Sequence, residues 1–506
     1  MIGTRVALVV SSEVRHSVAR ARGLYLRALG LVFVLAFASL LPQVSALLGP
    51  EGLSPAAELL GYVRQVLPSP ERYLRLPTLL WWFGAGEGAL HGVGWVGLGC
   101  GVLLVANVAP RWALVGAWAC YLSLATVGGV FLSFQWDVLL LETALVSLPL
   151  TPGHLWPPRV SLAPLPGAIL LPRLLLFRLM LMSGVVKLAS GDPTWRDFTA
   201  LQYHYWTQPL PNPLAWFAHL LPAGLLRAST AATFVIELVF PFLLLGPRRV
   251  RLFSAAMLAA LQLVILATGN YGFFNFLSLV LCLSALDDGV LVRWRLGGPL
   301  SAAPEPPRRH PRWRAAALVL FAVAYAFLGF SLDLQRLLSR PLPGALGTLL
   351  DDLAGFRSIN TYGLFAVMTT QRHEILIEGS ADGQTWKEYL LPYRPGRVDE
   401  APPIVAPHQP RLDWQLWFAA LSTCQRNPWL LRLQELLLRG GSDVRSLFSE
   451  DPFPDAPPRF VRTRLFDYHF TDWDTWRATG NWWTRRELGP YCPPLTLENG
   501  QLRAVP

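Results

Sequence analysis

Charged residues are scarce in this chain of 506 residues. They make up 15% of the sequence, whereas a typical soluble domain carries about 25%. Hydrophobic residues make up 53%, and they gather in long runs such as 31–48 and 314–332. A helix needs about 20 residues to cross the hydrocarbon core of a bilayer, and each run is close to that length. The composition therefore excludes an ordinary soluble protein and indicates an integral membrane protein.

Several signatures of catalytic and metal-binding sites are also missing. The sequence has no phosphate-binding P-loop, no HExxH motif and no GxSxG motif. Its five cysteines include no CxxC pair and no zinc-like spacing with histidine. Three of them lie in apolar runs and are interpreted as packing residues: Cys100, Cys120 and Cys282. Cys424 and Cys492 lie near the C-terminus and could form a disulfide. We expect no metal and no cofactor.

The net charge of +10 raises the question of nucleic-acid binding. The arginines lie mostly in short loops between apolar runs, which is the topology signal of a membrane protein rather than a phosphate-binding face. The N-terminal tail, the loop 247–251 and the loop 287–314 are the basic segments. We therefore expect no nucleic-acid partner, a cytoplasmic N-terminus, and a C-terminal region on the opposite side of the membrane.

Apolar windows predict a polytopic α-helical membrane protein with about nine transmembrane helices. A tail at 1–26 precedes a transmembrane domain at 27–335. The fourth window is short, which fits a tilted or re-entrant segment. No internal repeat or pair of broken helices indicates a transporter. The predicted spans are 27–48, 89–108, 112–132, 136–150, 168–190, 228–246, 251–268, 271–287 and 314–332.

A change of composition at about residue 350 predicts a C-terminal α+β extramembrane domain, rich in β structure, at 350–506. Residues 374–378 and 384–391 read as the strands of a hairpin, joined by a Gly- and Asp-containing turn. Residues 413–421 and 428–438 read as helices, and 460–470 reads as a further strand. At roughly 150 residues the domain is large enough to have a core of its own.

Four charged residues lie within predicted spans and form a predicted intramembrane charge network: Glu142, Arg178, Lys187 and Glu237. Charges at membrane depth are costly and are usually paired. Depths estimated at about 1.5 Å per residue predict that Arg178 pairs with Glu237 and Lys187 with Glu142. One interpretation is that the pairs only hold helices together. The other is a chemical site in which Lys187 acts as a base, with Glu142 and His204 as further candidates.

Several strings resemble the lipase maturation factor family over about residues 30–490. The most distinctive runs from Pro407 to Gln415, with the sequence PHQPRLDWQ. The others are FQWD from Phe134, LLET from Leu140, FRLM from Phe177, SGVVKL from Ser183, ALQYHY from Ala200, TGNY from Thr268 and NTYGLF from Asn360.

The resemblance implies a membrane-anchored folding factor, without enzymatic activity, whose partners are the lipid bilayer and a secreted lipase or other exported client. Animal members of the family reside in the endoplasmic reticulum membrane, with the C-terminal domain in the lumen. The Ala-, Leu-, Arg- and Pro-rich composition is typical of a bacterial member, for which the inner membrane and the periplasm are the equivalents. Five residues are then candidates for binding the client: Trp386, His408, Arg411, Asp413 and Trp414.

A shorter resemblance supports an alternative function. The segment Gly184–Leu188, followed by Trp195, is similar to the lysine-bearing segment of membrane proteins related to vitamin K-dependent carboxylase. That resemblance implies an intramembrane enzyme in which Lys187 acts as the base.

Overall fold

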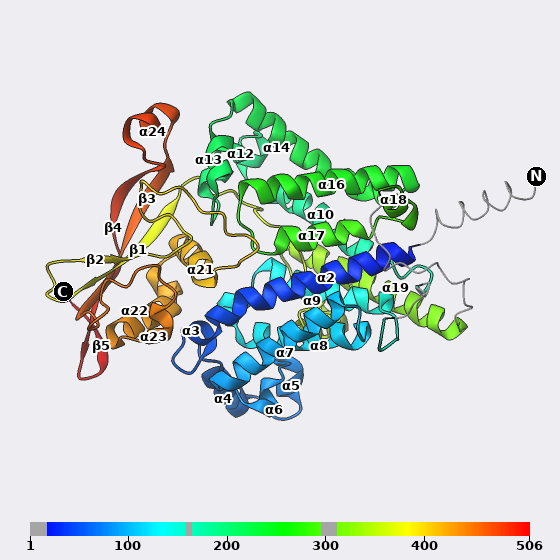
Figure 1. Cartoon of the computed structure of the whole chain (residues 1–506), viewed down its shortest axis with the longest axis horizontal. Helices are drawn as coiled ribbons and strands as arrows, with labels where there is room; N and C mark the ends of the chain where they lie inside the picture. The colour runs from blue at the N-terminus through cyan, green and yellow to red at the C-terminus, as the bar shows by residue number, and fades with distance from the viewer. Residues whose placement is uncertain (1–17, 158–163, 295–310, 506) are drawn as a thin grey trace, which may run out of the picture.

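The computed structural model describes residues 18–157, 164–294 and 311–505. It consists of a helical part and a C-terminal sheet domain, which lie at opposite ends of the long axis (Figure 1). The predicted fold class, a helical membrane protein with a C-terminal sheet domain, is confirmed. Much of the predicted tail at 1–26 and of the basic loop at 287–314 lies outside the described residues.

Each of the nine predicted spans coincides with a helix. In chain order, these helices are α2 (Ala19–Leu40), α7 (Glu87–Val105), α8 (Pro110–Val127), α9 (Gln135–Ser147), α10 (Leu170–Ala189), α14 (Ala223–Leu238), α16 (Arg248–Thr268), α17 (Phe274–Leu283) and α19 (Arg312–Leu338). The helix α2 continues through η1 (Leu41–Gln43) into α3 (Val44–Leu48), and α14 is extended by α15 (Phe240–Leu243).

Within the described ranges, five of these helical segments are long and apolar enough to cross a membrane: Ala19–Leu48, Glu87–Val105, Ala223–Leu243, Arg248–Thr268 and Arg312–Leu338. The helices α9 and α17 have only 13 and 10 residues, and α10 carries three basic residues. The count of nine spans therefore stays a prediction. In α16 and α19, most of the apolar surface is not covered by protein, as expected for helices that face lipid.

The helix α2 runs through the centre of the bundle and is the most buried of the five spans. It packs closely against α7 because glycines on α7 replace larger side chains at the contact. A Cβ atom at Gly97 would lie 2.1 Å from the ring of Phe37 on α2. The N-terminus of α2 is capped from α18 (Asp288–Arg293), where the Asp288 carboxylate accepts hydrogen bonds from the N–H groups of Ala19, Arg20 and Ala21 at 2.9–3.1 Å.

Short helices fill the connections between the long ones. They are α4 (Ala56–Val66), α5 (Glu71–Arg75), α6 (Leu80–Phe83), α11 (Pro193–Arg196), α12 (Ala200–Thr207), α13 (Pro213–His219) and α20 (Gly344–Ala354). The 3-10 turns η2 (Gly129–Leu132) and η3 (Leu148–Leu150) flank α9. The helix α20 is the last element before the chain enters the C-terminal domain.

The C-terminal domain contains one antiparallel sheet of five strands in the order β2-β1-β3-β4-β5. The strands are β1 (His373–Ser380), β2 (Lys387–Tyr389), β3 (Phe460–Phe470), β4 (Trp483–Glu498) and β5 (Gln501–Ala504). The helices are α21 (Arg411–Ala420), α22 (Pro428–Arg439), α23 (Ser442–Arg445) and α24 (Trp473–Thr479). The predicted hairpin, the two predicted helices and the strand at 460–470 are thereby confirmed.

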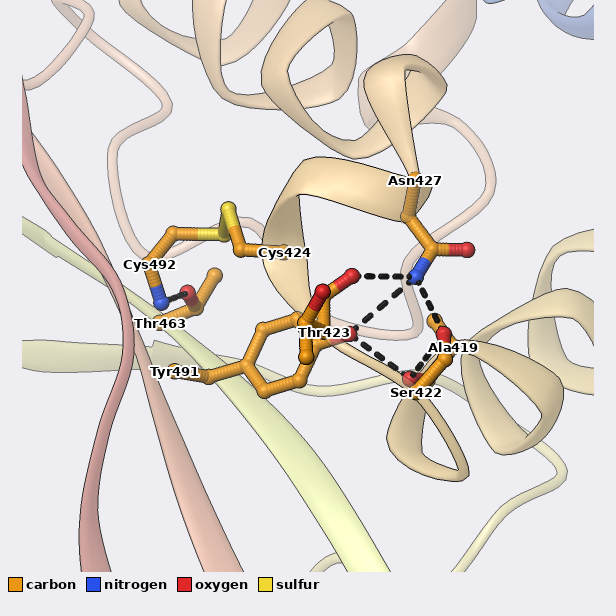
Figure 2. Close-up of a disulfide and its surroundings, with 8 residues drawn as sticks. All are labelled: Ala419, Ser422, Thr423, Cys424, Asn427, Thr463, Tyr491 and Cys492. Carbon is orange, nitrogen blue, oxygen red and sulfur yellow. Dashed lines mark hydrogen bonds between the residues drawn. A yellow bond between two sulfur atoms is a disulfide. The ribbon is translucent and has the colours of Figure 1, made fainter.

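A disulfide joins Cys424, in the turn η4 (Cys424–Arg426), to Cys492 on β4 (Figure 2). Next to it, the Tyr491 hydroxyl donates a hydrogen bond of 2.6 Å to the Ala419 carbonyl and accepts one from Asn427 at 3.1 Å. These contacts attach the corner between α21 and α22 to the sheet. The bond closes a loop of 68 residues, and a loop of that length constrains the unfolded chain strongly.

Candidate functional site

Arg178, on α10, lies between two carboxylates in the interior of the helical part. Its Nη1 is 2.9 Å from Oε1 of Glu142 on α9, and its Nε is 2.9 Å from Oδ2 of Asp333 on α19. Its Nη2 donates hydrogen bonds to the backbone carbonyls of Gly329 and Asn360, at 2.9 and 2.7 Å. Because the three charged side chains are almost completely buried, one planar guanidinium connects α9, α10, α19 and the segment that follows α20.

Glu142 is the second centre of this network. Its Oε1 accepts a hydrogen bond from the Tyr325 hydroxyl on α19, at 2.7 Å. Its Oε2 accepts hydrogen bonds from the backbone N–H of Asn360 and from the Tyr362 hydroxyl, both at 2.7 Å. The buried carboxylate thus has hydrogen-bond donors on both oxygens, as a buried charge requires. Two of its partners precede the first strand of the C-terminal domain, so Glu142 helps to fix that domain on the helices.

Lys187 forms a separate ion pair with Glu237 on α14. Its Nζ is 2.7 Å from both carboxylate oxygens and 5.2 Å from the centroid of the Trp195 ring. The helices α10 and α14 approach closely at this point because Gly184 has no side chain, and a Cβ atom there would lie 2.7 Å from Leu238. Both charged side chains are largely buried.

The predicted pairing of the four charges is therefore wrong. Arg178 pairs with Glu142, and Lys187 pairs with Glu237. Depth gives only the position along a helix axis, whereas the partner depends on the face. At about 100° per residue, the step of nine positions from Arg178 to Lys187 turns the helix by about 900°, which places the two side chains on opposite faces. Asp333 was missed because the predicted span ends one residue before it.

Lys187 and His204 both line a cavity of about 110 Å³ between α10, α12, α14 and α16. The Nε2 atom of His204 lies 3.1 Å from the Tyr271 hydroxyl, which donates a hydrogen bond of 2.7 Å to Gln208. Burial, aided by the charge of Lys187, lowers the pKa of His204 to about 4, so the ring is neutral at physiological pH. Glu142 is not among the residues that line the cavity. The three candidate catalytic residues are thus not brought together, and the enzyme alternative gains no support.

The segment His408–Arg411 lies against the C-terminal end of α2. The Nδ1 of His408 is 3.0 Å from the Ser39 hydroxyl, and burial lowers the pKa of His408 to about 4, with a smaller contribution from Arg411. The Gln43 side chain donates a hydrogen bond to the Gln409 carbonyl and accepts one from the backbone N–H of Arg411, at 2.9 and 2.8 Å. These bonds fix the start of α21 on the bundle.

Arg411 and Asp137 form a buried, two-point ion pair at this junction. The Nη1 and Nη2 of Arg411 lie 2.6 and 2.8 Å from the two carboxylate oxygens of Asp137 on α9. The Tyr121 hydroxyl donates a further hydrogen bond to Asp137, at 2.5 Å, and the Phe131 carbonyl accepts one from Arg411, at 2.9 Å. The two charged side chains are 1% and 0% exposed. The predicted charge network omits Asp137, although this residue lies inside the predicted span 136–150. A charged residue at that position indicates a buried partner.

Three of the proposed client-binding residues need correction, because Arg411, Asp413 and Trp414 are buried. The Trp414 ring contacts the Trp136 ring at a centroid distance of 4.8 Å. Asp413 accepts a hydrogen bond from the Tyr393 N–H at 3.1 Å, and burial raises its pKa to about 7. In a sequence, aromatic and charged residues in a loop have the same pattern whether they contact a partner or another part of the same chain. The structure places these three residues in the interior.

Trp386 remains available at the surface. It lies at the end of the β1–β2 hairpin and is half-buried, with the guanidinium carbon of Arg462 3.9 Å from its ring centroid. Arg462 is held in turn by Glu378, at 2.6 Å. His408 is only partly covered as well. Their roles as client-binding residues stay predictions.

Comparisons with known proteins agree with the two-part architecture. A model described as the lipase maturation factor transmembrane domain matches residues 20–293. A second, described as the lipase maturation factor C-terminal domain, matches residues 358–493. Lipase maturation factor 2 of Xenopus laevis is 33% identical, over 95% of this chain and 83% of its own length. Lipase maturation factor 1 of Homo sapiens is 33% identical, over 94% of this chain and 87% of its own length. No solved structure matches the chain.

Proposed function

The chain belongs to the lipase maturation factor family, and from this premise we propose that it is a membrane-anchored maturation factor. It helps secreted lipases, or similar exported proteins, to reach their active fold. The observation that carries the proposal is the buried junction between the two parts of the chain. The Arg411–Asp137 ion pair and the Glu142 hydrogen bonds hold the C-terminal domain in one position, where a client emerging from the membrane meets it.

The proposed topology has nine spans, with the N-terminus in the cytoplasm. Its domains are the tail at 1–26, the transmembrane domain at 27–335 and the C-terminal domain at 350–506. The basic loops support this orientation. The Cys424–Cys492 disulfide supports it independently, since disulfides persist in the endoplasmic reticulum lumen and the periplasm but are rare in the cytosol. The membrane is that of the endoplasmic reticulum in a eukaryote and the inner membrane in a bacterium.

The client-binding surface that we propose is the β1–β2 hairpin. Its loop residues 381–385 are exposed, and Trp386 presents an aromatic ring beside them. An incompletely folded lipase exposes apolar surface, and aromatic side chains contribute much of the binding energy at protein interfaces. The hairpin lies at the end of the sheet domain that is remote from the helical part (Figure 1).

A photo-crosslinking amino acid introduced at Gln384 tests this proposal in cells that synthesise a tagged secreted lipase. We expect an adduct between the hairpin and the newly made lipase, and a reduced yield when Trp386→Ala is added, because the aromatic contact is lost. The matched control is the same amino acid at Val323, which is 61% exposed on α19 and faces lipid in the proposed topology. No adduct at Gln384, or equal adducts at both positions, would contradict a client-binding role for the hairpin.

A further inference from the structure

The cavity beside Lys187 is enclosed mainly by apolar side chains. Helices α10, α16 and α17 contribute Leu179, Met180, Leu261, Ile265 and Phe274 to its walls. Its volume of about 110 Å³ exceeds the space that one water molecule needs, and its apolar walls can accommodate an apolar group. The cavity therefore suits part of an apolar ligand better than it suits solvent.

One wall of the cavity borders the outside of the helical part. Val264, on α16, lines the cavity, yet it is 56% exposed. Its helix is one of the candidate membrane spans, and most of that span is not covered by protein. In the proposed topology, the rim at Val264 therefore faces the lipid of the bilayer. A ligand that enters here comes from the membrane itself.

The polar groups in the cavity are balanced in charge. Lys187 and Glu237 neutralise each other through two hydrogen bonds of 2.7 Å, so the pair offers no excess charge to an ionic ligand. The Lys187 ammonium has three N–H groups, and two of them donate hydrogen bonds to Glu237. The neutral ring of His204 lines the same cavity. The site thus presents hydrogen-bonding groups without net charge at one corner of an apolar space.

We propose that this cavity binds an uncharged acyl lipid of the acylglycerol type, taken laterally from the bilayer between α14 and α16. Part of one acyl chain lies against the apolar walls while the rest of the lipid stays in the bilayer, and the ester or hydroxyl oxygens face the Lys187–Glu237 corner. A fatty acid or a phosphatidate would bring a negative charge into a charge-balanced, buried site, which is unfavourable. This inference does not depend on whether the C-terminal domain binds a client.

The test uses the full chain in lipid nanodiscs with a photoactivatable diacylglycerol, followed by mapping of the labelled peptides. We expect labelling of the segments 179–187 and 261–268, displaced by an excess of unlabelled dioleoylglycerol. The variant Val264→Trp is expected to lower this labelling about tenfold, because the indole fills the rim. The matched control is Leu263→Trp, since Leu263 neighbours it on the same helix and is 53% exposed but does not line the cavity.

The outcomes separate the proposal from its alternatives. Labelling that unlabelled dioleoylglycerol does not displace, or that both tryptophan variants leave unchanged, would show that the probe reports only lipid on the outer surface, and would overturn the proposal. Equal labelling by a photoactivatable fatty acid or phosphatidic acid would overturn the assignment of an uncharged ligand. The displacement experiment needs only the wild-type chain, so the proposal can fail even when a variant does not fold.

Discussion

Replacing Arg411 by methionine is expected to destabilise the folded chain by about 3–5 kcal/mol, the usual cost of removing one partner from a buried ion pair. The substitution leaves the Asp137 carboxylate, at 0% exposure, with hydrogen bonds from the Tyr121 hydroxyl and the Phe134 N–H but without its ion-pair partner. It also removes the hydrogen bond to the Phe131 carbonyl. We expect Arg411→Met to lower the amount of folded protein in membranes and to increase tryptic cleavage between the two domains.

A double variant and a surface control make this prediction specific. Adding Asp137→Leu to Arg411→Met should recover most of the lost stability, because an apolar pair of similar size carries no unpaired charge. The control Arg432→Met removes a partly exposed pair on α22, with Glu435 at 3.1 Å. Glu435 keeps Arg439 as a partner, so the change should cost less than about 1 kcal/mol. If Arg411→Met were as mild as Arg432→Met, the junction would not depend on this ion pair.

Replacing Arg178 by methionine is expected to have an effect at least as large, because it leaves two buried carboxylates without their partner. The helix α19 depends on this arginine. Its buried residues are Leu318, Tyr325, Gly329 and Asp333, and Arg178 bonds to the last three. We expect Arg178→Met to release α19 from the bundle, so that hydrogen exchange accelerates in the segment 358–363, whose Asn360 N–H bonds to Glu142.

The variant Gly329→Ala tests the same network with a smaller change in the protein. A Cβ atom at this position would lie 2.5 Å from the Arg178 guanidinium carbon, so Gly329→Ala should displace Arg178 and also accelerate exchange. The matched control is Gly99→Ala on α7, where nothing lies within 4 Å of the added atom. An alanine favours a helix over glycine, so the control should be neutral or stabilising. Equal behaviour of the two variants would contradict the role assigned to Arg178.

The helices of the membrane part could be predicted because a long apolar run in lipid must satisfy its own backbone hydrogen bonds, and it does so as an α-helix. The segment 314–332 illustrates this, since it lies entirely within α19. The partners of the buried charges could not be predicted from depth. The partners depend on which helices pack against each other, and the apolar pattern of one helix does not show which helices are its neighbours. The spacing of Arg178 and Lys187 in the sequence does predict that they lie on opposite faces of their helix. This spacing is enough to exclude a single cluster that contains both side chains.

The strand β4 was harder to predict than β3 because three prolines interrupt it: Pro490, Pro493 and Pro494. Proline lacks the N–H that a central strand donates, so it argues against a strand. The structure accommodates the prolines through register shifts against β3 and through the short length of β5, which pairs only with residues 495–498. The segment 407–415 is a different case. Its distinctive residues indicate a specific role, but only their burial in the structure shows whether that role is to bind a partner or to support the fold.

The specific activity of a secreted lipase, in cells that lack this protein, tests the maturation function most directly. We expect lipase that is made but inactive in the absence of the protein, and activity restored by the wild-type chain. A fully active lipase in the absence of the protein would contradict the maturation role.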